Sequence, residues 1–452
     1  MALKALKEID ENKAYANLAL DGVLRRFPLE SRDRALATEL VYGVARRQGT
    51  LDWALNQAAS RPVTQMHAWV RAILREAAYQ LMYLDKIPAH AALSEAVDLA
   101  KQYGHAGSAK FVNAVLRGLQ RKLPDLPYPP PEEDLTRHLA LRYSHPEWMV
   151  RMWVERYGPA EAGALMEAMN AVPPLTVRTN RLKGSPEQLR VLLEREGVTA
   201  VPTRWSPDGL TLQGVGESAL GRLAAFKAGW FTVQDESSML VAPALGPMPG
   251  ETVLDVAAAP GGKATHLAEL MDNRGKVIAL DIHPHKLALI RENARRLGVD
   301  IVAPVEGDAR QVHRLLPEGV DRVLVDAPCS GLGTLGRRPD ARWRKQPEDP
   351  ATLAQLQLEI LDSAAQVLRP GGVLIYSTCT IERHENQGVV AAFLAQHPEF
   401  EADDVWPYLP VGLWREPALP MGCVQLLPHR HKTDGFFLAR LEKSPQTFHA
   451  WD

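Results

Sequence analysis

Residues 252–377 alternate between short, nearly continuous apolar runs and longer stretches with helical periodicity. Apolar strands separated by helices are typical of a parallel sheet that helices cover on both faces. The pattern predicts a doubly wound, Rossmann-like α/β domain over residues 241–452. The expected strands are Thr252–Val256, Lys276–Ile282, Ile301–Val305, Arg322–Ala327 and Val373–Ser377, and the expected helices are Lys263–Met271, Pro284–Leu297 and Thr352–Leu368.

Sheets of this kind bind ligands beyond the carboxyl ends of their strands, so the residues after each strand are the candidates for a site. The first strand runs into Ala257-Ala258-Ala259-Pro260-Gly261-Gly262-Lys263. Adjacent glycines let the backbone approach a ligand, and the helix that follows offers free N–H donors. A phosphate P-loop does not fit, because Ala257 and Ala264 replace its Gly and its Ser or Thr. The dinucleotide fingerprint does not fit either, because this loop has only the pair Gly261-Gly262.

Three acidic residues end or follow the next strands. Asp281 ends the second strand, where a carboxylate can accept both hydroxyl groups of a ribose. Asp308 follows the third strand and can accept from an adenine amino group, and Asp326 ends the fourth. Three carboxylates and a glycine loop at one sheet edge indicate a ligand site better than any one of them does.

Two of the three cysteines, Cys329 and Cys379, follow the fourth and fifth strands. We expect no metal site, because zinc takes about four ligands in close pairs and the chain has no C-x-x-C. So few cysteines also argue against a disulfide framework and favour a reducing compartment. Thiolate chemistry remains for this pair, whereas Cys423 is expected to be a small core residue.

These motifs resemble those of the RNA cytosine-5 methyltransferases over residues 230–441. The resemblance rests on the 258–263 loop, Asp326-Ala-Pro-Cys-Ser-Gly331, Ser377-Thr-Cys379, Glu385-Asn386 and Gly435-Phe-Phe-Leu-Ala-Arg440. It implies that S-adenosylmethionine is the cofactor and that residues 257–263, Asp281, Asp308 and Asp326 bind it. Many relatives carry Cys where this chain has Ala257, a difference that we expect to alter packing rather than chemistry.

A thiolate beside a sulfonium methyl group fits one acceptor particularly well. Carbon 5 of a pyrimidine is a poor nucleophile, but adding a thiolate to carbon 6 makes an enamine that can attack the methyl group. The spacing of the motifs leaves open which cysteine attacks. The resemblance implies that Cys379 is the nucleophile, that Cys329 assists product release, and that Asp326 contacts the base at nitrogen 3.

The rest of the chain divides into three segments. Residues 1–123 carry helical periodicity with almost no strand pattern, which predicts an all-helical domain of six or seven helices. Their segments 34–43 and 110–117 resemble the NusB-type RNA-binding domain. Prolines crowd residues 124–131, so residues 124–145 are interpreted as a linker and connecting helix. Residues 146–240 mix helix and strand patterns and predict a small α+β domain.

The net charge of −2 gives no general basic excess, so any contact with RNA must come from local patches. Basic pairs occur throughout the helical domain, including Arg46-Arg47 and Lys110 with Arg117. The loop from Arg337 to Lys345 is expected to contact phosphates and to stack a base on Trp343. Arg178, Asn180, Arg181 and Lys183 fit either an RNA contact or a solvated edge.

With its NusB-like front, the chain resembles the Sun/RsmB type of bacterial ribosomal-RNA methyltransferase. The resemblance implies a cytoplasmic enzyme that methylates a cytosine of small-subunit (16S) rRNA, alone or in an assembling subunit. We expect the protein to be a monomer. We also expect no membrane contact, because the apolar runs are too short to span a bilayer. Two alternatives remain open: the same chemistry on tRNA, and a non-catalytic RNA-binding assembly factor. A dehydrogenase is disfavoured by the sequence of the glycine loop.

Overall fold

The computed structural model describes residues 1–27 and 29–445, which form two compact units. The helical unit contains residues 1–171 together with the excursion 335–347, and the sheet unit contains residues 172–334 and those from 348 onward. No helix in the described ranges is long and apolar enough to cross a membrane.

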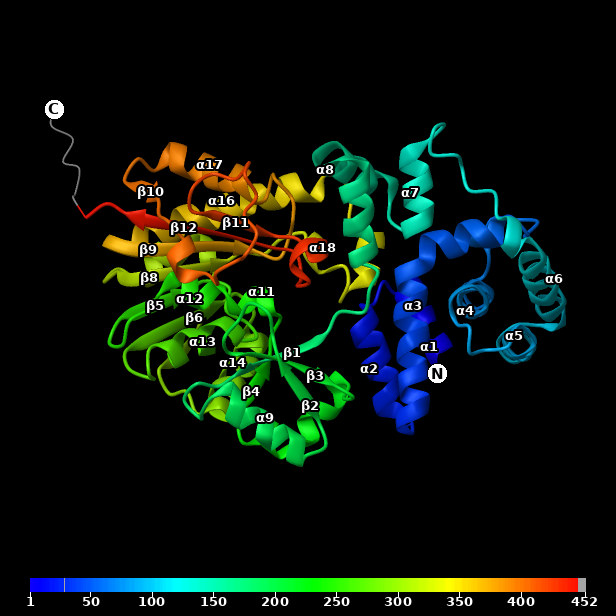
Figure 1. Ribbon diagram of the computed structural model, residues 1–452, viewed down its shortest axis with the longest axis horizontal. Helices are drawn as coiled ribbons and strands as arrows, with labels where there is room; N and C mark the ends of the chain where they lie inside the picture. The colour runs from blue at the N-terminus through cyan, green and yellow to red at the C-terminus, as the bar shows by residue number, and fades with distance from the viewer. Residues whose placement is uncertain (28, 446–452) are drawn as a thin grey trace. The chain divides into compact units, whose positions relative to one another are not determined.

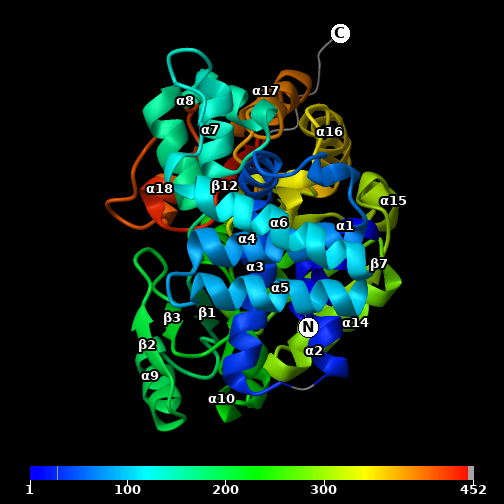
Figure 2. The ribbon, with the colours of Figure 1, turned by 90° about the vertical axis from the view of Figure 1, so that its right-hand side faces the viewer.

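The helical unit begins with six α-helices. They are α1 (Ala2–Glu11), α2 (Ala16–Arg26), α3 (Ser31–Asn56), α4 (Ala68–Tyr83), α5 (Ala89–Tyr103) and α6 (Ala106–Lys122), with short 3-10 turns η1 (Val63–Gln65) and η2 (Leu123–Asp125). Helix α5 packs against both α4 and α6, and Figure 2 shows these three helices beside one another. Their apolar faces form one core around Leu51, Leu74 and Leu116, which are fully buried. The apolar positions of the helical pattern in the sequence are thus the ones that pack between these helices.

Two further helices and one distant segment belong to the same unit. These are α7 (Leu135–Tyr143), α8 (Glu147–Ala168) and η6 (Pro339–Trp343). Helix α8, which the sequence pattern assigns to the small domain, lies by its backbone contacts in the unit of the helices before it. Helix α8 bends at Gly158, whose φ of +78° is outside the helical range.

The expectation that the loop from Arg337 to Lys345 contacts RNA is wrong for Arg342 and for Trp343. The Arg342 guanidinium is fully buried, where it donates to the Ser144 carbonyl at 3.0 Å and to Asn170 Oδ1 at 2.8 Å. The indole N–H of Trp343 donates to the Ala45 carbonyl at 2.8 Å. Protein groups satisfy the guanidinium of Arg342 and the indole N–H of Trp343, so these two residues are structural, whereas Arg338 of the same loop is exposed.

The sheet unit opens with a small antiparallel sheet in the order β2-β3-β1-β4. Its elements are β1 (Leu175–Thr179), α9 (Pro186–Arg195), β2 (Thr199–Pro202), β3 (Gly209–Gln213), η3 (Glu217–Arg222), α10 (Ala224–Lys227) and β4 (Phe231–Val233). This order and the β-α-β-β-α-β connectivity are ferredoxin-like. The expected α+β domain is confirmed as this motif.

The large sheet runs β10-β12-β9-β8-β5-β6-β7, with β11 paired to β12. Its strands are β5 (Thr252–Asp255), β6 (Lys276–Asp281), β7 (Val302–Glu306), β8 (Val320–Asp326), β9 (Leu368–Thr378), β10 (Phe400–Ala402), β11 (Cys423–Leu426) and β12 (Phe436–Lys443). Strands β5 to β9 pair in parallel, as expected. Strand β12 is antiparallel to β9, so the sheet is mixed, and these last strands were not anticipated.

Helices cover both faces of this sheet (Figure 1). They are α11 (Glu236–Met239), α12 (Val241–Leu245), α13 (Gly262–Leu270), α14 (Pro284–Leu297), α15 (Val312–Leu315), α16 (Asp349–Val367), α17 (Gln387–Gln396) and α18 (Pro428–His431), with short turns η4 (Ala309–Gln311), η5 (Leu332–Thr334) and η7 (Trp406–Tyr408). Val253 packs with α12, α13 and α14, whereas its neighbour Leu254 packs with α16 and α17 on the other face. Both faces of each parallel strand are buried, which explains their continuous apolar sequence.

Candidate active site

The loop between β5 and α13 forms a narrow backbone turn. Gly261 has a φ of +102°, which side chains with a Cβ atom rarely adopt, and a Cβ there would lie 3.3 Å from the Ile290 backbone. A Cβ atom at Gly262 would meet no atom within 4 Å, so the backbone at this position borders open space. The start of α13 therefore presents its N–H groups beside a cradle lined by main chain.

The side chain of Arg178 in β1 hydrogen-bonds to the start of α13, which ends this loop. Its guanidinium is fully buried and donates to the Gly262 carbonyl at 2.7 Å and to Glu269 Oε1 at 2.8 Å. Asn180 is also buried and donates to the carbonyls of Gly229 and Leu297. Arg178 and Asn180 therefore neither face RNA nor form a solvated edge, so both alternatives given for them are wrong. Instead, they join the ferredoxin-like sheet to the large sheet.

Lys263 and Asp326 form an ion pair at the edge of the large sheet. The Lys263 ammonium lies 2.7 Å from Asp326 Oδ2, and the Ser377 hydroxyl donates to Asp326 Oδ1 at 2.9 Å. Burial lowers the pKa of Lys263, but the charge and hydrogen bond of Asp326 and the charges of Asp255 and Cys379 outweigh it, so the pKa is raised. A cation is therefore held beside the thiol that follows β9.

The two predicted cysteines meet at this edge. Their sulfur atoms lie 3.4 Å apart, both thiols are free, and both side chains are half-buried. The hydrogen bond to Cys379, burial, and the negative charges of Cys379, Glu385 and Asp326 together raise the pKa of Cys329 well above its usual range. The two thiols therefore titrate as a coupled pair, in which ionisation of one disfavours ionisation of the other.

Asp255 is a candidate site residue that the sequence analysis did not single out. It ends β5 and is 1 % exposed, and its carboxyl oxygens have no well-formed hydrogen bond within the described ranges. Burial and the charge of Asp326 raise its pKa to about 7, although Lys263 and the Ala257 N–H act in the opposite direction. Its position at the end of the first parallel strand was the available signal.

We expect Asp255→Asn to remove part of the pH dependence of stability. The folded-state pKa of about 7 lies above the ordinary 3.8, so folding takes up a proton between these values. The resulting stability is full below the lower value and is lost as pH rises through the higher one. The free energy of unfolding of Asp255→Asn, relative to that of the wild type, should therefore be higher at pH 8 than at pH 4 by about a few kcal/mol. Urea unfolding at both pH values measures this difference, and equal shifts at both would contradict it.

The remaining predicted residues lie along the same edge in different environments. Asp281 is buried and accepts from the His283 N–H at 2.9 Å, while the next side chain, Ile282, is 52 % exposed. Asp308 caps η4 and pairs with Arg310 at 2.6 Å, so its carboxylate already has a partner. That hydrogen bond, with the charge of Arg310, lowers the pKa of Asp308. Cys423 is a buried residue of the core, as expected.

The fold is thus that of a Rossmann-like enzyme domain with a ligand cradle and two thiols at one sheet edge. The family described as 16S rRNA methyltransferase RsmB/F matches residues 242–442. The NusB family matches residues 1–121, and a ferredoxin-like domain of RsmF/B-like methyltransferases matches residues 145–217.

Full-length relatives agree with these matches. The chain is 43% identical over 446 residues to the probable ribosomal RNA small subunit methyltransferase B of Bacillus subtilis, covering 98% of each chain. It is 37% identical to ribosomal RNA small subunit methyltransferase B of Sodalis glossinidius, over 93% of this chain and 92% of the relative. The chain therefore belongs to the RsmB/F family of 16S rRNA methyltransferases.

Solved structures show the same architecture. The crystal structure of PH0851 matches with a TM-score of 0.82 and 30% identity, covering 98% of both chains. NSun6 from Pyrococcus horikoshii, solved with the S-adenosylmethionine analogue SFG, matches with a TM-score of 0.58 and 26% identity. That match covers 67% of this chain and 99% of the other.

Proposed function

We propose that this protein transfers a methyl group from S-adenosylmethionine to carbon 5 of a cytosine in 16S rRNA, through a covalent bond to Cys379. The observation that carries the proposal is the thiol pair. Two sulfur atoms 3.4 Å apart lie at the edge that also holds the glycine loop and the Lys263–Asp326 ion pair. Methyl transfer to oxygen or nitrogen needs no thiolate, whereas carbon 5 of cytosine does.

The residues present fit S-adenosylmethionine. The open backbone at Gly262 accommodates a closely approaching group, and the unpartnered Asp255 carboxyl suits a cationic one. Asp281 supplies a carboxylate for ribose hydroxyls, and the exposed Ile282 beside it supplies an apolar surface for an adenine ring. When bound here, the cofactor supplies an electrophilic methyl group.

The chain's own groups then account for each bond. The Cys379 thiolate adds to carbon 6, which breaks the double bond between carbons 5 and 6, and nitrogen 3 takes a proton from the Lys263–Asp326 pair. Carbon 5, now an enamine carbon, would take the electrophilic methyl group, whose bond to the sulfonium sulfur would break to leave a neutral thioether. Removal of the carbon 5 proton restores the double bond and expels the Cys379 thiolate, and nitrogen 3 returns its proton to Asp326 and Lys263.

The pKa of Cys329 suits the order of these steps. Before attack, the hydrogen bond to Cys379 is the largest cause of its raised pKa, and the Cys379 charge adds to it. Bonding Cys379 to carbon 6 removes both causes, so the pKa of Cys329 falls. Cys329 can then release its own proton to solvent and, as a thiolate, accept the carbon 5 proton.

The substrate is tested by incubating the protein with labelled S-adenosylmethionine and either purified small-subunit rRNA or tRNA. We expect 5-methylcytosine at one position of the rRNA, mapped by sequencing, and no label in tRNA. Label in tRNA alone would favour the tRNA alternative. No label in either substrate, with binding of rRNA retained, would favour the assembly factor.

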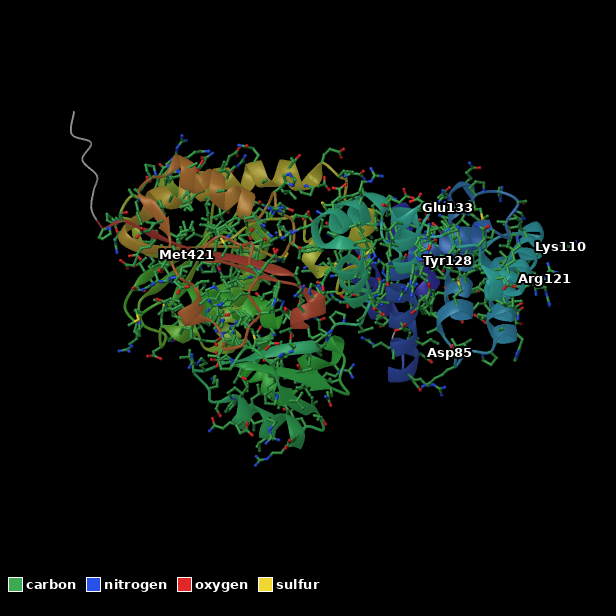
Figure 3. The ribbon with its side chains drawn as sticks, turned by 45° about the horizontal axis from the view of Figure 1, so that its top comes forward. Asp85, Lys110, Arg121, Tyr128, Glu133 and Met421 are labelled. Atoms are coloured by element: carbon green, nitrogen blue, oxygen red, sulfur yellow. The ribbon has the colours of Figure 1, made fainter. Side chains whose placement is uncertain are left out.

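Helix α6 offers a basic surface for this RNA. Lys110, Arg117 and Arg121 are exposed and share one face of the helix, at spacings of seven and four residues. Figure 3 shows Lys110 and Arg121 extending outward from the helical unit. Arg46, another basic residue expected to face RNA, is buried and donates to the Gly336 carbonyl. The surface is thus confined to fewer residues than the sequence indicated.

Replacing Lys110, Arg117 and Arg121 together with Ala should weaken rRNA binding by about tenfold or more at low salt. Each phosphate contact contributes roughly 0.7 to 0.9 to the slope of log K against log salt, so the slope should fall by about 2. Filter binding at several salt concentrations measures both quantities. Lys101→Ala is the control, since Lys101 is an exposed residue of α5 paired with Asp98. An unchanged slope in the triple variant would contradict the assignment.

A further inference from the structure

Glu385 and Asn386 lie between the Cys379 segment and α17, and both side chains are fully buried. Polar side chains are rarely buried so completely unless partners satisfy them. Their partners are the residues that flank the two cysteines in sequence. One pair of consecutive residues therefore reaches both thiol-bearing segments.

Glu385 holds the segment that carries Cys329. Its Oε1 accepts from the Ser330 N–H at 2.7 Å, and its other oxygen accepts from the Ser330 hydroxyl. Gln357 of α16 donates both to Glu385 Oε1 at 3.0 Å and to the Pro328 carbonyl at 2.9 Å. The residues immediately before and after Cys329 are thus fixed by the same pair of side chains.

Asn386 holds the segment that carries Cys379 in the same way. Its Oδ1 accepts from the Thr378 hydroxyl at 2.6 Å, and its Nδ2 donates to the Thr380 carbonyl at 3.1 Å. The amide also donates to Gln425 Oε1 of β11 at 3.0 Å, which ties it to the sheet. The residues on both sides of Cys379 are therefore fixed by one amide.

The two halves are joined to each other. The hydroxyl groups of Ser330 and Thr380 lie 2.8 Å apart, and the single Tyr376 O–H is shared between the Glu385 carbonyl and Gln357 Oε1. A buried polar network whose members are satisfied is rigid, because each lost bond leaves an unpaired group. This buried network therefore fixes the distance between the two thiols.

We propose that Glu385 and Asn386 are positioning residues, Glu385 for Cys329 and Asn386 for Cys379. The proposal rests on the proposed function for its kinetic consequences but not for its geometric ones. Because Glu385 and Asn386 contact different cysteine segments, loosening the Glu385 contacts should mainly impair proton removal and release, and loosening the Asn386 contacts should mainly impair thiolate attack.

The geometric test needs no RNA. Diamide accepts two electrons and two protons from a pair of thiols, leaving a Cys329–Cys379 disulfide and a hydrazine product. We expect this cross-link to form rapidly in the wild type and about tenfold more slowly in Glu385→Ala and Asn386→Ala, because the sulfur atoms drift apart. Peptide mass spectrometry after alkylation measures the rate. If either Ala variant fails to fold, Gln357→Leu and Thr378→Val can replace Glu385→Ala and Asn386→Ala. Each removes only part of one set of contacts, so each should slow the cross-link by a smaller factor.

The kinetic test uses rRNA and labelled S-adenosylmethionine. Asn386→Ala should slow single-turnover methyl transfer by about tenfold or more, without accumulating covalent complex. Glu385→Ala should retain the first methyl transfer but accumulate a protein–RNA complex that survives denaturing gels. Glu385→Gln should behave within about threefold of the wild type, because its amide oxygen can keep both bonds of Oε1 and its NH2 group can donate to the Ser330 hydroxyl, which then donates to Thr380 instead. A large defect in Glu385→Gln would instead assign the role to charge and overturn positioning.

Asp403→Asn is the matched control, since Asp403 is also a carboxylate in a structural contact, the ion pair with Arg440. It should leave both the cross-linking rate and the accumulated complex unchanged. The inference would be overturned if Glu385→Ala and Asn386→Ala had equal effects on methyl transfer and equal effects on accumulation of the covalent complex. It would also be overturned if their effects were no larger than those of Asp403→Asn. Either result would leave the proposed function intact. Absence of methyl transfer in the wild type would overturn the proposed function, and the cross-linking rates would still decide the positioning roles.

Discussion

Cys379→Ala is expected to reduce methyl transfer to rRNA by at least about 10⁴-fold, the size of effect seen when a covalent nucleophile is removed. Alanine deletes the sulfur that must add to carbon 6, and neither Lys263 nor Cys329 can replace it at that position. Incorporation of labelled methyl groups under single-turnover conditions measures the loss. Binding of S-adenosylmethionine, followed by calorimetry, should change by less than about threefold, because the glycine loop and Asp281 remain.

Cys423→Ala is the control for this experiment. It makes the same change at a buried cysteine of β11 that packs in the core below the site. We expect it to cost some stability and to retain methyl transfer. Turnover by Cys379→Ala above about 1 % of the wild-type rate would assign the nucleophile elsewhere, with Cys329 as the first candidate, because its sulfur lies 3.4 Å away.

Cys329→Ala is expected to trap the reaction after methyl transfer. Cys379 can still add to carbon 6, but no thiolate remains to take the carbon 5 proton, so the bond between protein and RNA persists. The complex should appear as a slowly migrating species on denaturing gels and should carry the label of the transferred methyl group. Multiple turnover should fall by at least about 10²-fold, the size expected for loss of a positioned proton acceptor.

The double variant Cys329→Ala/Cys379→Ala separates this explanation from non-specific cross-linking. It should give no complex, because the bond to carbon 6 requires the Cys379 sulfur. Full turnover by Cys329→Ala would mean that water or another group removes the proton. A complex in the double variant would mean that the cross-link does not involve the proposed nucleophile.

Much of the fold follows from local sequence patterns. The apolar runs that became β5, β6 and β8 are nearly continuous because helices cover both faces, and that burial leaves a direct trace in the sequence. Because ligands bind beyond the carboxyl ends of parallel strands, the sequence alone predicts that Asp281, Asp326 and Cys329 lie at one edge. Strand β12 carries a similar buried apolar run, Phe436-Phe437-Leu438-Ala439, but the run by itself does not specify that the strand pairs with β9 or that the pairing is antiparallel.

The errors share one cause. Arg178, Arg342 and Trp343 are types that are usually exposed or that suit nucleic acid, and their sequence neighbours gave no sign of burial. In the structure each is satisfied by backbone carbonyls or carboxylates from distant segments, such as Gly262 for Arg178 and Ala45 for Trp343. Such partners lie tens to hundreds of residues away in the chain, so only folding reveals them.

The sequence by itself determined the family, the order of the domains and the residue types gathered at the sheet edge, because motifs and periodicities are local. The tertiary structure alone decided the separation of the two thiols, the pairing of Lys263 with Asp326 and the burial of Asp255. It also decided that Glu385 and Asn386 contact the neighbours of both cysteines. Hydrogen bonds and desolvation depend on distances between segments, and those distances exist only once the chain has folded.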